Sequence, residues 1–184
     1  MDFTQYWDKI NENKQELSSL YSSYWNKYSD LSTWLFWVEL ALLVVPLLLL
    51  FFVVDRKKLF EVLFFGYTVH MIWSYTQIAL GRSTLFYHNY FLLPILPNAS
   101  NVTASLLPVG YLLLYQYCSN RHKNFLIFAP LLSAVFTFGF ASIEKYLGLI
   151  SFQNRMNQFW LFLIGIVIAY ISYRITKFFQ IIQN

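Results

Sequence analysis

Long apolar runs separated by short polar turns make up most of the chain from residue 32 onward. A helix needs roughly 20 residues to cross the hydrocarbon core of a bilayer, and five runs reach or approach that length. They span about residues 34–54, 59–80, 102–118, 125–143 and 159–175. The pattern predicts an all-α integral membrane protein in which residues 32–184 form a bundle of five transmembrane helices.

Residues 1–31 follow a different pattern. Phe3, Ile10, Leu17 and Tyr24 recur at intervals of seven residues, and polar residues fill most positions between them. This spacing places the apolar side chains on one face and predicts an amphipathic helix outside the membrane-spanning domain. Three arrangements fit this helix: it lies in the membrane interface, docks on the outer mouth of the bundle, or pairs with another chain.

The segment 85–97 is apolar and aromatic but too short to cross a bilayer. Its two prolines lack backbone donors, which argues against a continuous helix. We therefore expect a half-buried segment in the outer leaflet, or one that re-enters the bundle, because irregular backbone at membrane depth must pack against protein or a wet cavity. One of the polar residues around its end, Asn98, Ser100 or Asn101, is predicted to cap the third transmembrane helix.

Composition excludes a soluble globular domain of this size. Hydrophobic residues make up 58% of the chain and charged residues only 12%, which is about half the charged share of an ordinary soluble domain. The single cysteine, Cys118, excludes an internal disulfide and a metal cluster held by several cysteines. The net charge of +4 does not indicate nucleic-acid binding, because the cationic residues stand at the ends of apolar runs.

The distribution of lysine and arginine predicts the orientation of the bundle. The turns 55–58 and 119–124 and the C-terminal end together carry more of these residues than the opposite side. Cytoplasmic ends of membrane helices carry the excess of positive charge. We therefore expect the N-terminus outside and the C-terminus in the cytoplasm.

Polar residues inside the apolar runs are candidates for function, because each is costly in hydrocarbon unless it is paired. Glu39 and His70 lie on consecutive antiparallel helices, and a contact between them is feasible. Ser74 and Gln77 continue the polar face of His70, and Thr137 lies on a similar face of the fourth helix. These five residues are candidates for a ligand or proton pathway. Interhelical hydrogen bonding that only locks the bundle is the alternative.

A second polar group is expected at the outer side, where Arg82, His88, Glu144 and Arg155 gather between the apolar runs. Such a cluster fits an interfacial lipid-modifying enzyme, but it also fits solvated loop ends. The chain has none of the common catalytic or phosphate-binding motifs, and its three histidines lack metal-ligand spacing. We therefore predict no metal and no cofactor, and enzyme activity stays a minor alternative.

Small residues recur at helical spacing in the fifth apolar run. Gly165, Ala169 and Ser172 share one face of the predicted helix, and small residues allow another helix to approach closely. This face predicts close helix packing or self-association.

Three blocks of sequence carry a resemblance to a known family. They are Pro108-Val109-Gly110-Tyr111 through Tyr115-Gln116-Tyr117 with Lys123, the turn Asp55-Arg56-Lys57-Lys58-Leu59, and Gly81 with Leu85-Phe86-Tyr87 and Leu93-Pro94. The chain resembles a functionally uncharacterised family of small multi-pass membrane proteins of endospore-forming bacteria such as bacilli. The resemblance covers about residues 31–175. It implies a bacterial plasma membrane as the location and implies no activity.

These observations favour a non-enzymatic membrane protein that acts through helix contacts, either as a partner subunit or as a self-associating scaffold. Its expected partners are the lipid bilayer and either another copy or another membrane protein. The alternative is a binding or transport pathway for a small solute, ion or lipid, lined by Glu39, His70 and Gln77. A lipid-modifying enzyme is the third hypothesis.

Overall fold

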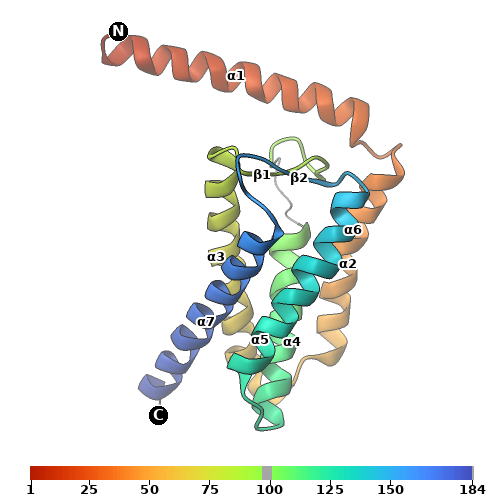
Figure 1. Ribbon diagram of the computed structural model, residues 1–184, viewed down its shortest axis with the longest axis vertical. Helices are drawn as coiled ribbons and strands as arrows, with labels where there is room; N and C mark the ends of the chain where they lie inside the picture. Colours follow the sequence, from red (N-terminus) through yellow and green to blue (C-terminus); the bar gives the residue numbers. More distant parts are fainter. Residues whose placement is uncertain (97–100, 184) are drawn as a thin grey trace.

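The computed structural model describes residues 1–96 and 101–183, which form a helical bundle with one helix lying across its end (Figure 1). In the described residues the order of elements is α1 (Phe3–Tyr28), α2 (Trp34–Val53), η1 (Arg56–Lys58), α3 (Leu59–Arg82), β1 (Phe86–His88), η2 (Val102–Leu106), α4 (Leu107–Asn120), α5 (Phe125–Ala134), η3 (Val135–Phe140), α6 (Ala141–Tyr146), β2 (Ile150–Phe152) and α7 (Gln158–Gln183). The expected helical class is confirmed.

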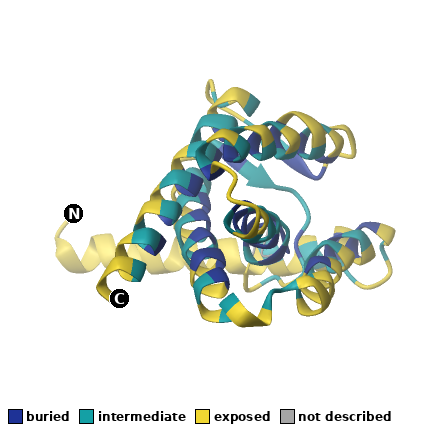
Figure 2. Ribbon diagram, turned by 90° about the horizontal axis from the view of Figure 1, so that it is seen from below, coloured by how far each residue is buried: buried dark blue, intermediate teal, exposed yellow. Residues whose placement is uncertain are grey.

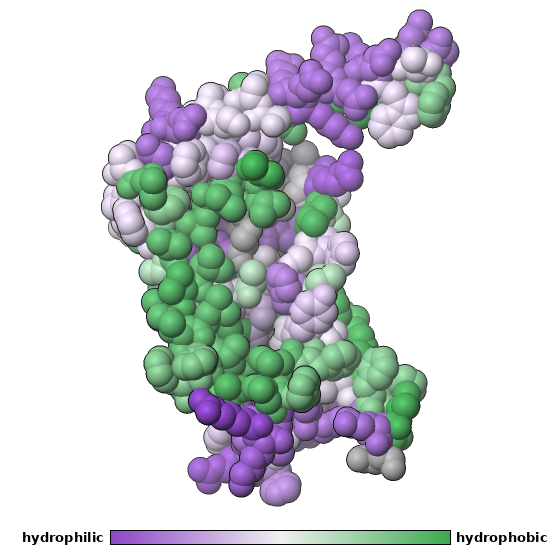
Figure 3. Space-filling model, turned by 180° about the vertical axis from the view of Figure 1, so that it is seen from behind, coloured by the Kyte–Doolittle hydropathy of each residue, from purple (hydrophilic) through white to green (hydrophobic). Residues whose placement is uncertain are grey.

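In the part of the chain that the structure describes, three helices are long and apolar enough to cross a membrane: α2, the continuous run Phe125–Tyr146 and α7. Figure 3 shows a broad hydrophobic band between hydrophilic ends of the molecule. The chain is therefore an α-helical membrane protein. The helix α3 is also long, but its polar residues lower its hydropathy, and the α-helical part of α4 is only 14 residues.

The core lies around α4, which the other helices enclose. Tyr111 and Tyr115 are each only 1% exposed, and Figure 2 shows the buried residues at the centre with exposed surfaces outside. Close packing of α3 on α4 depends on Gly66, since a Cβ atom there would lie 2.5 Å from Cδ1 of Leu112. This packing fixes how the polar face of α3 meets α4.

Two stretches of the bundle are wound as π-helix. The third predicted helix begins with η2, and the fourth predicted helix passes through η3 and ends at Tyr146 rather than near residue 143. Pro108, the second residue of α4, cannot donate to the carbonyl of Ala104, so the regular α-helical ladder is interrupted there. The wider π turns change the direction of the side chains on both helices.

The amphipathic N-terminal helix is present as α1, capped by Asp2 and Gln5 in a reciprocal capping box. It contacts the bundle only near its end. The Tyr24 hydroxyl donates to the Asn89 carbonyl at 3.0 Å, and Trp25 Nε1 donates to the Phe91 carbonyl at 3.1 Å. No residue of α1 is buried. The helix therefore docks on the end of the bundle by its last turns, and the rest extends beyond it (Figure 1).

The segment expected to be half-buried forms part of a small sheet. Strand β1 pairs antiparallel with β2, with Phe86 opposite Phe152 and His88 opposite Ile150. The sequence analysis missed this sheet, because three-residue strands are too short to show alternation. Asn101 does not cap a helix; its side chain binds Glu39 instead. Residues 97–100, with the other capping candidates, lie outside the described residues.

Candidate functional site

A small cavity lies inside the bundle near the end that carries the sheet. Its volume is about 50 Å³, and it is lined by residues of α3, β1, η2, α4, η3, α6 and α7. We call it the inner cavity. Its polar residues are Gln77, His88, Thr103, Thr137 and Glu144, and aromatic side chains form much of the remaining wall.

Two buried polar atoms belonging to residues of this wall have no hydrogen-bond partner among residues 1–96 and 101–183. They are the carboxylate oxygen Oε1 of Glu144 and the indole nitrogen Nε1 of Trp73. Glu144 is 4% exposed and Trp73 is 8% exposed. A buried polar atom without a partner costs roughly 1–3 kcal/mol, and a charged one costs more. Both atoms could bind a ligand or ordered water in the inner cavity.

Both π-helical segments meet at this cavity. Thr103 comes from η2, and Phe136, Thr137 and Phe140 come from η3. Insertions that create π turns occur frequently at functional sites, because they turn side chains away from the regular helical face. After the π turns of η3, the short helix α6 places Glu144 at the cavity wall. The π-helical segments and the polar side chains therefore lie at the same cavity.

A second buried carboxylate lies close to the first. Glu39 is 2% exposed and accepts a hydrogen bond from Nδ2 of Asn101. The charges of Glu39 and Glu144 oppose each other when both carboxylates are ionised. The two acidic groups therefore occupy one low-dielectric region without a compensating lysine or arginine from the described chain. Such an arrangement is unfavourable unless positive charge or a proton is added.

Glu39 and His70 bind neighbouring residues rather than each other. Nδ1 of His70 lies 2.9 Å from the carbonyl oxygen of Thr103, so this nitrogen carries the proton and donates. Ser74 Oγ lies 3.4 Å from the same nitrogen. The segment beginning at Asn101 packs against both α2 and α3 and supplies a hydrogen-bond partner to Glu39 and to His70.

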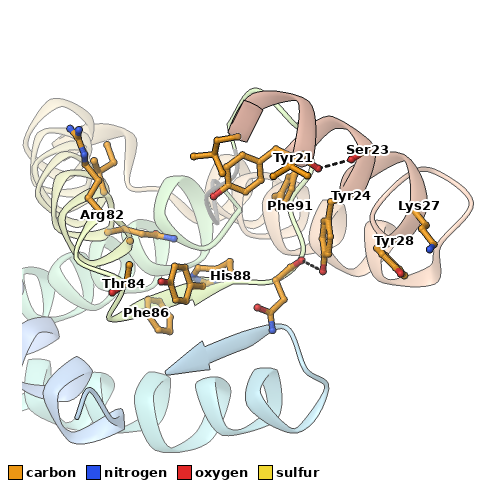
Figure 4. A pocket seen from close by; sticks show the side chains of 17 residues that line it. Tyr21, Ser23, Tyr24, Lys27, Tyr28, Arg82, Thr84, Phe86, His88 and Phe91 are labelled. Carbon is orange, nitrogen blue, oxygen red and sulfur yellow. Dashed lines mark hydrogen bonds between the residues drawn. The ribbon is translucent and has the colours of Figure 1, made fainter. Parts of the chain in front are cut away.

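A larger cleft of about 980 Å³ separates α1 from the end of the bundle (Figure 4). We call it the outer cleft. Tyr21 and Tyr24 face it from α1, and both rings contact Phe91. The outer cleft and the inner cavity share Gln77, Phe86 and His88 in their walls. These three residues therefore stand between the surface and the buried carboxylates.

His88 is neutral in this position. Its side chain is half-buried, and the loss of hydration lowers the pKa of the imidazole to about 3. A neutral imidazole offers one donor and one acceptor rather than a positive charge. His88 therefore adds polarity between the outer cleft and the inner cavity without repelling a cation.

The predicted outer polar cluster is divided. His88 and Glu144 meet at the inner cavity, whereas Arg82 is exposed at the end of α3 and lines the outer cleft. Arg155 is exposed in the loop after β2, with a positive φ of 68°. The four residues do not form one catalytic surface. Gln77 and Thr137, predicted as pathway residues, do line the inner cavity.

The small-residue face of α7 packs inside the chain. Gly165, Ala169 and Ser172 are all buried. A Cβ atom at Gly165 would lie 3.2 Å from the Tyr111 hydroxyl and 3.3 Å from Ser133 Oγ. This face was expected either to pack closely or to self-associate, and its buried position fits close packing within the monomer.

Two residues of the site, Trp73 and Asn101, were not predicted to belong to it. Trp73 lies four residues before Gln77, a spacing that places both on one face of α3. That spacing indicates that Trp73 shares the polar face of α3, but a tryptophan in an apolar run also fits an aromatic anchor at the membrane interface. Asn101 gave no sequence signal for its bond to Glu39, because the two residues are distant in the chain.

No group of three or more histidine, cysteine or acidic side chains suited to hold a metal ion occurs among residues 1–96 and 101–183. Searches of protein-family models, of curated proteins and of solved structures found no match to this chain.

Proposed function

We propose that this membrane protein binds a small monovalent cation in the inner cavity and that the cation reaches it from the outer cleft. The observation that carries the proposal is the buried carboxylate oxygen Oε1 of Glu144, which has no hydrogen-bond partner in the described part of the chain. Glu39 lies near enough to act on it electrostatically. A bound monovalent cation offsets one of the two negative charges in a region where water cannot, and a proton on the other carboxyl group removes the second.

The walls of the inner cavity suit a cation. Trp73, Tyr111, Phe136 and Phe140 present aromatic rings to it, and ring faces attract cations through their quadrupole. A water molecule needs roughly 10–15 Å³ of such space, so about 50 Å³ accommodates a small ion with a few waters. One of these waters accepts the hydrogen bond of Trp73 Nε1. The ligand is therefore an alkali ion or a small ammonium ion.

The route to the site passes through the outer cleft. Gln77, Phe86 and His88 belong to both cavities, so a shift of β1 by the width of a side chain connects them. The aromatic side chains of Tyr21 and Tyr24 line the entrance. Transport of the cation across the membrane is the further step of this proposal.

The topology belongs to the same proposal. Five spanning segments include α3 and the run from η2 through α4, in addition to the three strongly apolar helices. The N-terminus lies outside and the C-terminus in the cytoplasm of a bacterial plasma membrane, so the outer cleft faces outward. Support comes from the excess of lysine and arginine at the end opposite α1.

A partner-subunit role is the second candidate, and α1 supports it. The apolar residues of α1, including Phe3, Trp7 and Ile10, are exposed, and a helix with such a face commonly meets a membrane surface or another helix. Self-association through Gly165 has no support, because that face is occupied within the chain. Both candidate roles are non-enzymatic.

Calorimetric titration of the protein in zwitterionic nanodiscs tests cation binding, with Na⁺, K⁺, NH₄⁺ and methylammonium as the probes. We expect one or more of these ions to bind the wild type and to bind Glu144→Gln roughly a hundredfold more weakly. The matched control is Glu61→Gln, which removes a carboxylate at the other end of α3 that does not line the inner cavity. Binding that is equal in the wild type and Glu144→Gln, or no binding of any of the four ions, overturns the proposal.

A further inference from the structure

A second polar cavity lies at the other end of the bundle. It has a volume of about 460 Å³ and is lined by residues of η1, α3, α4, α5 and α7 and of the turn after α4. We call it the basal pocket. The residues that matter for its chemistry are Lys58, Glu61, Ser119, Lys123, Tyr173 and Lys177. None of them lines the inner cavity or the outer cleft.

Two of the lysines are held in place. Nζ of Lys58 donates to Ser119 Oγ at 3.0 Å, and Nζ of Lys177 donates to Gln180 Oε1 at 2.8 Å. The Lys177 ammonium also lies 5.6 Å from the ring centre of Tyr115 and 5.8 Å from that of Tyr173. Each ammonium group has three donors. Both lysines are half-buried, so they keep donors free for a ligand while their positions are fixed.

The charge of the pocket is positive. Three lysines face it against one glutamate, and Glu61 already accepts a hydrogen bond from the Tyr115 hydroxyl. Lys123 comes from the turn after α4, where its backbone nitrogen donates to the Cys118 carbonyl at 2.9 Å. Positive groups from three separate segments therefore converge on one cavity. Lysines that served only to orient the protein in the membrane would not need to line the same cavity.

The position of the basal pocket along the bundle indicates which kind of anion fits it. The hydrophilic end opposite α1 borders the hydrophobic band of the molecule (Figure 3). Phe64 and Phe179, whose ring centres lie 5.4 Å apart, expose apolar surface on α3 and α7, two of the helices that form the pocket. Basic pockets between membrane helices at this depth bind lipid head groups. Phosphate oxygens accept hydrogen bonds from several ammonium groups at once.

We propose that the basal pocket binds a phosphate group. The phosphate belongs to the head group of an anionic lipid or to a soluble phosphate compound. In either case Lys58 and Lys177 make the principal contacts. This site is independent of cation binding in the inner cavity.

The experiment measures thermal stability and native mass spectra of the protein in nanodiscs. One arm compares phosphatidylglycerol with phosphatidylcholine, and the other adds inorganic phosphate to phosphatidylcholine nanodiscs. The variant is Lys58→Gln with Lys177→Gln, and the control is Lys57→Gln, which removes an exposed lysine of the same turn that does not line the pocket. We expect the double variant to bind the anion roughly tenfold more weakly than the wild type and the control.

Retention of phosphatidylglycerol by the wild type and the control, but not by the double variant, identifies the lipid as the source. Stabilisation by inorganic phosphate with the same dependence identifies a soluble anion. If the double variant does not fold, displacement of phosphatidylglycerol by phosphate from the wild type still supports the proposal. No preference for either anion in the wild type, or an equal loss in the Lys57→Gln control, overturns it.

Discussion

The side-chain amide of Asn101 donates a hydrogen bond to the carboxylate of Glu39 and joins α2 to the segment that leads into η2. Asn101 is 1% exposed and Glu39 is 2% exposed. His70 of α3 binds the carbonyl of Thr103 on the same segment. The buried carboxylate is thus held by an amide rather than by a cation, and three parts of the bundle meet at this point.

Replacement of Asn101 by alanine is expected to destabilise the bundle. The change leaves the Glu39 carboxylate without its donor, which costs about 1–3 kcal/mol for a buried polar group. The unfolding midpoint in detergent titrated with denaturant measures this loss. Asn13→Ala, at an exposed position of α1, is the control. Equal stability of the two variants would show that the hydrogen bond contributes nothing.

The Gly165→Ala substitution is expected to lower the stability of the monomer. The Tyr111 hydroxyl and Ser133 Oγ lie 3.2 and 3.3 Å from the added Cβ. Both residues are 1% exposed and bind each other, so neither can move aside freely. Overpacking of this kind costs about 1–3 kcal/mol.

Gly139→Ala is the matched control for Gly165→Ala, because nothing lies within 4 Å of a Cβ at Gly139. We expect this control to be neutral or stabilised by up to about 1 kcal/mol. Thermal unfolding together with light scattering separates the effects. A Gly165→Ala protein of normal stability but altered oligomeric state would contradict packing of this face within the monomer.

Acidification is expected to weaken the small sheet through His88. Burial lowers the pKa of His88 to about 3 in the folded protein, against about 6.5 in an unfolded chain. Between these two pKa values, the opened state of the sheet binds more protons than the folded state. The free energy of opening therefore falls as the pH decreases from about 6.5 toward 3. At pH 5 the loss amounts to about 2 kcal/mol.

Hydrogen exchange of the amides of β1 and β2 measures this effect between pH 7.5 and 5, after correction for the intrinsic exchange rate. The control is His122→Gln, which removes an exposed histidine at the other end and should keep the pH dependence. His88→Gln should remove it. Protection that does not change with pH in the wild type would contradict a buried, neutral His88.

Removal of residues 1–20 is expected to leave the stability of the bundle unchanged. These residues are exposed, and the hydrogen bonds of α1 to the bundle start at Tyr24. The unfolding midpoint of the truncated protein should match that of the full chain within error. A large loss would mean that this part of α1 packs on the bundle. Loss of a copurifying protein at unchanged stability would favour the partner-subunit role.

The helical class could be predicted because apolar runs of membrane length and seven-residue spacing are properties of the chain itself. The spacing of Phe3, Ile10 and Leu17 predicted α1 correctly as an amphipathic helix. The pairing of β1 with β2 could not be predicted, since each strand has three residues and the pairing joins distant parts of the chain. The π turns of η2 and η3 were not predicted either, because apolar patterns do not distinguish them from α-helix.

The site was predicted only in its separate parts. Gln77, Thr137 and Glu144 were identified as polar residues on helices, and burial brings all three to the inner cavity. Their arrangement depends on the π turns, which a regular helical projection ignores. Asn101 was assigned a local capping role, because its bond to Glu39 depends on tertiary packing. Residue type thus predicted polarity, and the fold decided which polar groups meet.

The most direct measurement is the anomalous difference density of crystals of the protein soaked with thallium(I), which takes the place of potassium or ammonium. We predict a peak in the inner cavity beside Oε1 of Glu144, present in the wild type and in Glu61→Gln and absent in Glu144→Gln. An intact wild-type structure whose inner cavity contains no thallium would contradict cation binding at this site.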